Sequence, residues 1–205
     1  MYYWGLPDAS VEFCEDKYVV TSWIGEYYNT LSSLCYILVA VFFLSTKVKK
    51  IAWSVIGIGV GSMLLHGTLR YYGQWLDELS MLITSFNSLH YIRPNIKEIF
   101  FVKEILLPLI IITYFIFHNV FIIFFVCFSL LNLTLLYLTA KNSSVLGKLY
   151  IFSFGGGFMC WTLDKFGCIF FKDYYFHAWW HILSSIGILF ALLELLYNPP
   201  KLKDA

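Results

Sequence analysis

Three histidines and one aspartate stand in apolar surroundings in this chain: His66, Asp77, His177 and His181. Ionisable side chains are costly at membrane depth and usually mark a functional site there. Three neutral imidazoles can hold a zinc ion and leave one tetrahedral position open to water, as in catalytic zinc sites. Zinc lowers the pKa of such a water to about 7 and polarises a nearby carbonyl. These residue types therefore predict an intramembrane metal hydrolase.

The spacing of the candidate residues suggests a role for each. Asp77 has the chemistry of a general base that takes a proton from water and returns it to a leaving amine. Ser62 lies four residues before His66, on the same helix face, and could donate a hydrogen bond to a developing oxyanion. His177 and His181 are also four residues apart. Such a pair alone is more often a packing feature than a metal site, and the addition of His66 and Asp77 reverses that preference.

The composition predicts a membrane protein. Of 205 residues, 60% are hydrophobic, 20% are aromatic and only 13% are charged, whereas soluble domains carry about 25% charged residues. We expect a single all-α domain over residues 1–205, a seven-transmembrane helix bundle. The net charge of +1 gives no reason to expect a nucleic-acid partner, and the sequence identifies no protein partner.

Apolar length marks seven spans, each close to the ~20 residues that cross a bilayer core. The spans are approximately residues 22–45, 51–69, 75–93, 99–117, 119–140, 147–168 and 176–197. A luminal acidic segment (1–21) precedes them and a cytosolic tail (198–205) follows them. The fourth and fifth spans divide one apolar stretch that is too long for a single crossing, so we expect a turn near His118 and Asn119.

The basic residues predict the orientation of this bundle. One side carries Lys47, Lys49, Lys50, Arg93, Lys97, Lys103, Lys141, Lys148, Lys201 and Lys203, and the other carries only Lys17, Arg70, Lys165 and Lys172. The positive-inside rule then places the C-terminus in the cytosol and the N-terminus in a lumen or outside the cell. The three histidines and Asp77 all fall near the luminal side. One site would thus gather residues from three helices.

The N-terminal segment carries a second acidic group, which consists of Glu12, Glu15 and Asp16, with Glu26 at the luminal end of the first span. Oxygen ligands on an irregular loop suit calcium. A solvated acidic face is the more common meaning of such a cluster. From the residues alone, we expect a solvated face.

The order of these groups resembles the alkaline ceramidase family, within the superfamily of seven-helix zinc hydrolases that includes the adiponectin receptors. The resemblance covers most of the chain. It is carried by Glu12-Phe13-Cys14-Glu15, by Glu26-Tyr27-Tyr28-Asn29-Thr30, by Gly61-Ser62 to His66 with Asp77-Glu78, by Trp161-Thr162-Leu163-Asp164, and by His177-Ala178-Trp179-Trp180-His181. It implies hydrolysis of ceramide to sphingosine and a free fatty acid. The implied roles are zinc binding by His66, His177 and His181, proton transfer by Asp77 and assistance by Ser62.

The resemblance also implies a calcium site in the N-terminal segment. The corresponding positions are Glu12, Phe13 through its backbone carbonyl, Glu15, Lys17 and Glu26. Lys17 stands where the family usually has asparagine, and an ammonium cannot ligate a cation. We therefore expect calcium to be weakened or replaced at this position. Glu12, where the family usually has aspartate, is a milder departure. Ser33 is a further departure, at a position where the family often has asparagine.

The cysteines and the tail bear on the compartment. The resemblance implies a disulfide between Cys14 and Cys168, both on the luminal side, where an oxidising lumen permits a bridge. The remaining cysteines are expected to be packing residues within spans; they are Cys35, Cys127 and Cys160. The tail 201–205 looks like a dilysine retrieval signal. We expect residence in the endoplasmic reticulum, with the Golgi as the alternative.

Two other functions stay open. The chain could hydrolyse another lipid amide or ester, or it could be a zinc-containing lipid-sensing receptor without catalysis. Asp77 and Ser62 beside the metal favour chemistry, because a structural zinc is more often closed by four protein ligands.

Overall fold

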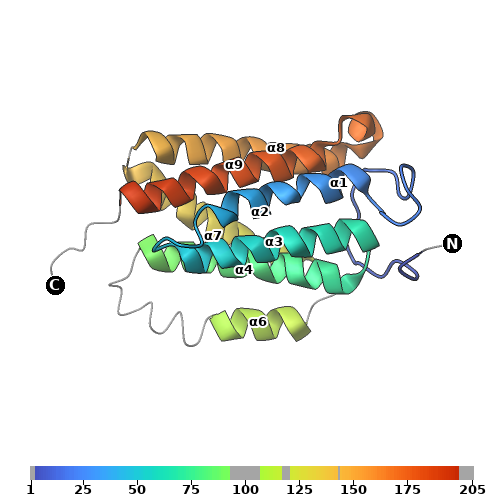
Figure 1. Ribbon diagram of the computed structural model, residues 1–205, viewed down its shortest axis with the longest axis horizontal. Helices are drawn as coiled ribbons and strands as arrows, with labels where there is room; N and C mark the ends of the chain where they lie inside the picture. The colour runs from blue at the N-terminus through green and yellow to red at the C-terminus, as the bar shows by residue number, and fades with distance from the viewer. Residues whose placement is uncertain (1–2, 93–106, 117–120, 143, 199–205) are drawn as a thin grey trace.

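Helices lie side by side along the long axis of the molecule (Figure 1). The computed structural model describes residues 3–92, 107–116, 121–142 and 144–198, and within these ranges it contains helices and no strand. The elements are α1 (Tyr27–Ser32), α2 (Leu34–Val41), α3 (Lys49–Thr68), α4 (Tyr71–Ile92), α6 (Leu107–Ile116), α7 (Phe121–Asn142), α8 (Val145–Phe171), the 3₁₀ helix η2 (Lys172–Tyr174) and α9 (Phe176–Tyr197). The expected all-α class is confirmed for this part of the chain.

The first expected span, 22–45, is divided into α1 and α2, which meet at Ser33 and together cover residues 27–41. The Glu15 carboxylate explains why α1 begins at residue 27. It accepts hydrogen bonds from the backbone amides of Tyr28, at 2.7 Å, and Asn29, at 2.9 Å. Unpaired amides at a helix start need such acceptors. A polar side chain from the preceding segment therefore sets this boundary.

Other helices extend beyond the apolar stretches that predicted them. α4 begins at Tyr71 rather than at residue 75, so Asp77 lies in its second turn rather than at its start. α8 covers residues 145–171 in place of the expected 147–168. Apolar length marks the part of a helix suited to lipid, whereas helical hydrogen bonding continues into the polar flanks. The expected turn at His118 and Asn119 and the tail 199–205 lie outside the described residues.

Three helices in the described part of the chain are long and apolar enough to cross a membrane: Lys49–Thr68, Phe121–Lys141 and Phe176–Tyr197. The segment Tyr27–Val41 is apolar but shorter. α4 has the length of a span, but it carries the buried polar residues Gln74, Asp77 and Glu78. These features indicate a membrane protein, and the count of seven spans stays a prediction.

Two glycines let α3 and α4 pack closely near the turn that joins them. A Cβ at Gly61 would collide with the backbone of Asp77, and a Cβ at Gly73 would collide with the backbone of Leu65. The turn itself passes through Leu69, whose φ of 56° is left-handed. In membrane proteins, small residues at helix interfaces commonly allow backbones to approach this closely. It brings Asp77 next to the last turns of α3.

The N-terminal segment folds over the end of the bundle where α3 joins α4 and α8 joins α9 (Figure 1). The backbone amide of Asp8 donates to the Leu69 carbonyl at 3.1 Å, and the Asp8 carboxylate pairs with Arg70 at 2.9 Å. A disulfide joins Cys14 to Cys168, as the resemblance implied, with 5.4 Å between their Cα atoms. These contacts hold the segment as a cover on that end.

Candidate active site and metal centre

The three histidines meet inside the bundle, beneath the N-terminal segment. His66 comes from the last turn of α3, and His177 and His181 come from the first turns of α9. Their exposed fractions are 0%, 4% and 2%. The ring centroids lie 4.9 Å apart for His66 and His177, 5.0 Å for His66 and His181, and 4.6 Å for His177 and His181.

The donor atoms of this cluster fit a metal ion. One ligand atom from each histidine lies within 4.8 Å of the other two. Among the residues that the structure describes, the buried Nε2 of His66 and Nδ1 of His177 have no hydrogen-bond partner. Buried polar atoms rarely lack a partner in native proteins. Three buried imidazoles with ligand atoms this close together are a donor set that suits zinc.

The other ring nitrogens of two histidines are held by polar groups. Nδ1 of His66 contacts Oε2 of Glu26. Nδ1 of His181 lies 3.1 Å from the Asn29 carbonyl and 2.8 Å from the Ser32 hydroxyl. Histidines that bind metals usually donate their second N–H to a carboxylate or a carbonyl, which fixes the tautomer and the ring orientation. This is the pattern seen here.

The contacts of Glu26, Asn29 and Ser32 with the histidines were not predicted from the sequence. Glu26 was expected as a calcium ligand, and Asn29 and Ser32 were not singled out. A signal was present, because residues 26, 29, 32 and 33 are polar in an otherwise apolar stretch. Spacings of three and four place such residues on one helix face. That face points at the histidine cluster.

Asp77 and Ser62 lie beside the histidines. Both line one cavity with His177 and His181. Asp77 is 9% exposed, and within the described residues its buried Oδ1 has no hydrogen-bond partner. The Ser62 hydroxyl lies 3.4 Å from Nε2 of His181 and accepts a hydrogen bond from Ser33 at 2.9 Å. The Ser33 hydroxyl also lies 2.7 Å from the Asn29 carbonyl, so its single proton has two possible acceptors.

The neighbouring carboxylate, Glu78, is held differently. Its Oε1 accepts a hydrogen bond from Gln74 at 2.9 Å, and its Oε2 accepts one from Tyr114 at 2.6 Å. Both oxygens of Glu78 therefore already have a donor. Of these two adjacent acids in the described residues, Asp77 is the one with a buried oxygen that has no hydrogen-bond partner.

Phe13 has a role that the sequence analysis did not predict. Only its backbone carbonyl was expected to matter, but its ring packs against two of the histidines. The ring centroids are 3.8 Å apart for Phe13 and His177 and 4.9 Å apart for Phe13 and His66. The ring thus covers the cluster on the side of the N-terminal segment.

The expected calcium positions surround the Lys17 ammonium. Its Nζ donates to the carbonyls of Phe13, at 2.7 Å, and Glu15, at 2.8 Å, and it pairs with the Glu26 carboxylate. Glu12 has an exposed side chain. The Glu15 carboxylate is engaged at the start of α1, and burial raises its pKa, although the amides of Tyr28 and Asn29 lower it.

Asp164, the last residue of the Trp161-Thr162-Leu163-Asp164 motif, connects the N-terminal segment to the helices. It is 3% exposed, and its Oδ2 accepts a hydrogen bond from the backbone amide of Cys14 at 3.2 Å. The backbone of His177 is a second hydrogen-bond partner. One carboxylate therefore ties the N-terminal segment, α8 and the start of α9 together.

Comparison with known proteins identifies the family. A profile described as Ceramidase matches residues 5–199. This chain belongs to the ceramidase family.

Three relatives illustrate the match. Alkaline ceramidase 3 of Mus musculus is 27% identical and covers 96% of this chain and 86% of its own length. Alkaline ceramidase YPC1 of Saccharomyces cerevisiae is 29% identical, and the match covers 94% of this chain and 77% of the yeast protein. The alkaline ceramidase of Arabidopsis thaliana is 27% identical, and the match covers 90% of this chain and 82% of the plant protein.

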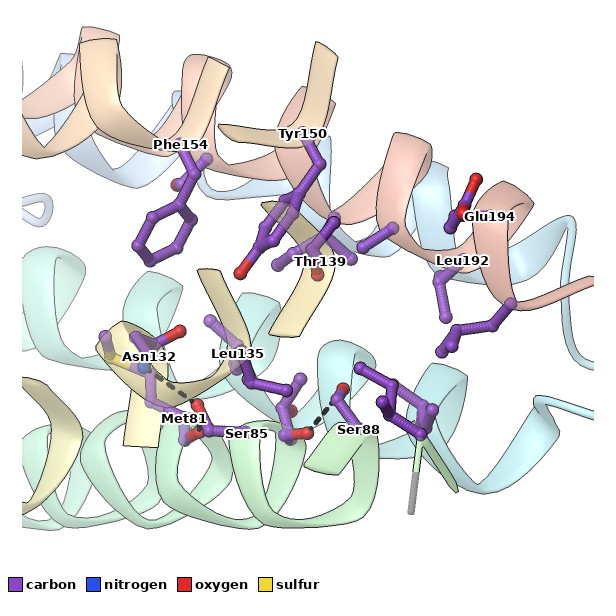
Figure 2. Close-up of a pocket in the computed structure, with 18 of the residues that line it drawn as sticks. Met81, Ser85, Ser88, Asn132, Leu135, Thr139, Tyr150, Phe154, Leu192 and Glu194 are labelled. Atoms are coloured by element: carbon purple, nitrogen blue, oxygen red, sulfur yellow. Dashed lines mark hydrogen bonds between the residues drawn. The ribbon is translucent and has the colours of Figure 1, made fainter. Parts of the chain in front are cut away.

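Two neighbouring cavities lie within this ceramidase-family chain. The cavity beside the histidines and a second one share five lining residues, which are Tyr36, Ile58, Met81, Phe128 and Trp180. The second encloses an empty volume of about 970 Å³ and reaches Thr139 and Glu194. Figure 2 shows Tyr150 and Phe154 of α8 facing Ser85 of α4 and Asn132 of α7 across it. The lining is mostly apolar, with a polar row on one wall.

Proposed function

We propose that this protein is a zinc-dependent intramembrane amidase that hydrolyses ceramide to sphingosine and a free fatty acid. Membership of the ceramidase family and the alkaline ceramidase names of its relatives support the reaction class and the substrate. The observation that carries the mechanism is the buried cluster of His66, His177 and His181 with Asp77 and Ser62 in the same cavity.

The zinc ion would be held by the three histidines. When bound, zinc supplies an acidified water and polarises a carbonyl. Asp77 would take a proton from the attacking water through its open Oδ1. The water oxygen bonds to the carbonyl carbon, the C–N bond breaks with its electron pair on nitrogen, and Asp77 delivers the proton to the leaving amine.

Ser62 and Phe13 would assist this reaction in different ways. Ser62 would donate its hydroxyl proton to the carbonyl oxygen as negative charge develops there. The Phe13 ring lies over His66 and His177 and would limit the access of bulk water from the N-terminal side. Exclusion of water strengthens the electrostatic interactions within a site.

The larger cavity adjoins the one beside the histidines and suits a substrate with a long apolar chain. Its lining is mostly apolar. Pockets for lipid-sized ligands are mostly apolar with a few placed polar groups. One hydrocarbon chain of ceramide would lie in this cavity, which places the amide next to Asp77.

The proposal includes a seven-span topology with the site toward the lumen of the endoplasmic reticulum. The apolar lengths of the segments and the division of the basic residues support it. Lys47, Lys49 and Lys50 precede or begin α3, at the opposite end from His66. Calcium would have little effect on activity, because the ammonium of Lys17 already contacts the oxygens that a calcium ion would need.

The test is the release of fatty acid from a panel of ceramides by the purified, detergent-solubilised protein, together with its zinc content. His177→Ala is the control. We expect about one zinc per chain and cleavage that is lost together with the metal in the variant. Stoichiometric zinc without cleavage of any ceramide would reject this substrate and favour another lipid amide or ester, or a receptor.

A further inference from the structure

The side chain of Lys17 reaches into a pocket of oxygen atoms. Its ammonium contacts the carbonyl oxygens of Phe13 and Glu15 and Oε1 of Glu26. An ammonium has three N–H donors, so these three acceptors satisfy all of them. Carbonyl and carboxylate oxygens are also the ligands that calcium prefers. The Lys17 ammonium therefore lies among oxygen atoms of the kind that bind a soluble cation.

The Glu26 carboxylate links this cation to the histidine cluster. The residue is 1% exposed. Its Oε1 faces Lys17. Its Oε2 contacts Nδ1 of His66 and accepts a hydrogen bond from the side-chain amide of Asn29 at 3.0 Å. A buried carboxylate is stable as an anion only when it is paired and hydrogen-bonded. Lys17 provides the positive charge that keeps Glu26 in this arrangement.

The contact between Glu26 and His66 decides which histidine nitrogen faces the metal centre. A histidine that donates Nδ1–H to a carboxylate keeps a lone pair on Nε2. In this structure the buried Nε2 of His66 is an atom with no hydrogen-bond partner among the described residues. The arrangement of the anion thus determines the availability of the metal ligand.

We propose that Lys17 is a positioning residue, an internal cation that holds Glu26 against His66 and so presents Nε2 of His66 to the metal without any soluble cation. The inference rests on the zinc site of the proposed function but not on the identity of the lipid. Lys17 acts on affinity for the metal and touches neither the metal nor the substrate.

The affinity of the metal site is the direct measurement. The full-length protein in detergent is stripped of metal and titrated with zinc against a chelator, and with cobalt, whose visible absorption reports the ligand geometry. Lys17→Met keeps the length of the side chain and removes its charge. We expect affinity to fall by about 10–100-fold, as it does when orienting partners of metal ligands are removed, with an altered cobalt spectrum.

A matched control comes from η2, which borders the N-terminal segment. Lys172 pairs with Asp16 at 2.6 Å on the surface rather than with Glu26. Lys172→Met therefore removes an ammonium near the segment without touching the carboxylate beside His66. We expect its zinc affinity and cobalt spectrum to match those of the unaltered protein. An equal loss in both variants would reject a specific role for Lys17.

A rescue experiment separates positioning from general folding. Lys17→Asn replaces the ammonium with an oxygen ligand, so calcium should restore zinc affinity in this variant and leave the unaltered protein unchanged. A Lys17→Met protein that retains full zinc affinity would overturn the inference, as would calcium enhancing zinc affinity in the unaltered protein. Neither result depends on ceramide cleavage, so the proposed function can fail or survive separately.

Discussion

At the scale of single residues, the partners of each acid indicate what it can do. Asp77 and Glu78 are adjacent and both are buried. Glu78 accepts hydrogen bonds on both oxygens, from Gln74 and Tyr114, whereas within the described residues Oδ1 of Asp77 has no hydrogen-bond partner. A proton acceptor needs an oxygen that can reach water. Their hydrogen bonding, rather than their residue type, distinguishes these two acids.

Asp77→Asn tests this distinction. We expect the variant to bind zinc normally and to lose turnover by about 10²–10⁴-fold, the usual contribution of general acid–base catalysis. Turnover and zinc content are measured on the same preparation. Glu78→Gln is the control and should retain far more activity. Normal turnover by Asp77→Asn would remove the residue from the mechanism.

His181→Ala tests the metal site itself. The substitution removes one of three ligands, and we expect both zinc and amidase activity to be lost while the protein still inserts into the membrane. Membrane fractionation, metal content and ceramide cleavage are the three measurements. The control is His90→Ala. His90 lies in the last turn of α4, and this variant should retain zinc and activity. Full activity of His181→Ala would exclude this centre.

The sequence allowed the candidate residues to be predicted but not the groups that orient them. His66, His177, His181 and Asp77 were identifiable because ionisable side chains are rare in apolar stretches and because helical spacing places them on shared faces. The polar face at residues 26, 29, 32 and 33 was recognisable, but its contact with His181 was not. Serine occurs throughout apolar helices, and only tertiary packing determines which hydroxyl meets an imidazole.

At the scale of helices, close contact between α3 and α4 places Asp77 against the histidine-bearing turn. Gly61 makes that contact possible, because any Cβ there would meet the backbone of Asp77. The sequence places Gly61 one residue before Ser62, but it did not show which helix would approach it. The division of the first span at Ser33 was not predicted either, since apolar length carries no information on a break.

Gly61→Ala should separate α3 from α4. We expect a loss of about 1–3 kcal/mol of stability, the typical cost of overpacking, and a larger loss of activity because Asp77 moves away from His66. Thermal unfolding and turnover are compared with those of Gly155→Ala, where nothing lies within 4 Å of the added Cβ. Equal behaviour of the two variants would show that the close contact is dispensable.

At the scale of the whole molecule, opposite ends of the bundle have different characters. The histidines, the disulfide and the N-terminal cover lie at one end (Figure 1). Lys47, Lys49 and Lys50 lie at the other end, with the start of α3. Hydropathy and charge predicted this polarity from sequence, because both follow from the solvent that surrounds each segment. They could not predict the cover, which depends on side-chain contacts with distant turns.

Glycosylation tests the orientation. Asn142-Ser143-Ser144 forms an acceptor sequence that the proposed topology places in the cytosol. We expect no sugar there, and we expect a sugar on an acceptor sequence added in an N-terminal extension. The measurement is a mobility shift on treatment with a glycosidase. Sugar at Asn142 would contradict the seven-span arrangement.

Filling the cavity tests where the substrate chain lies. Ala191 lines the larger cavity, and Ala191→Phe should slow the cleavage of long-chain ceramides by about tenfold or more while sparing short-chain ones. Val126→Phe adds bulk at a residue of α7 that is 47% exposed and should leave chain preference unchanged. Equal slowing of all chain lengths by Ala191→Phe would argue against a chain in this cavity.

The disulfide between Cys14 and Cys168 also has a consequence for biosynthesis. The two cysteines are 154 residues apart, and chains are made from the N-terminus. The segment that covers the histidines is therefore synthesised first, yet it can be fastened only after α8 has emerged. Until this disulfide forms, the N-terminal segment of the newly made chain is not covalently fixed over the candidate metal ligands. Maturation of this protein would then be timed by the last third of its own translation.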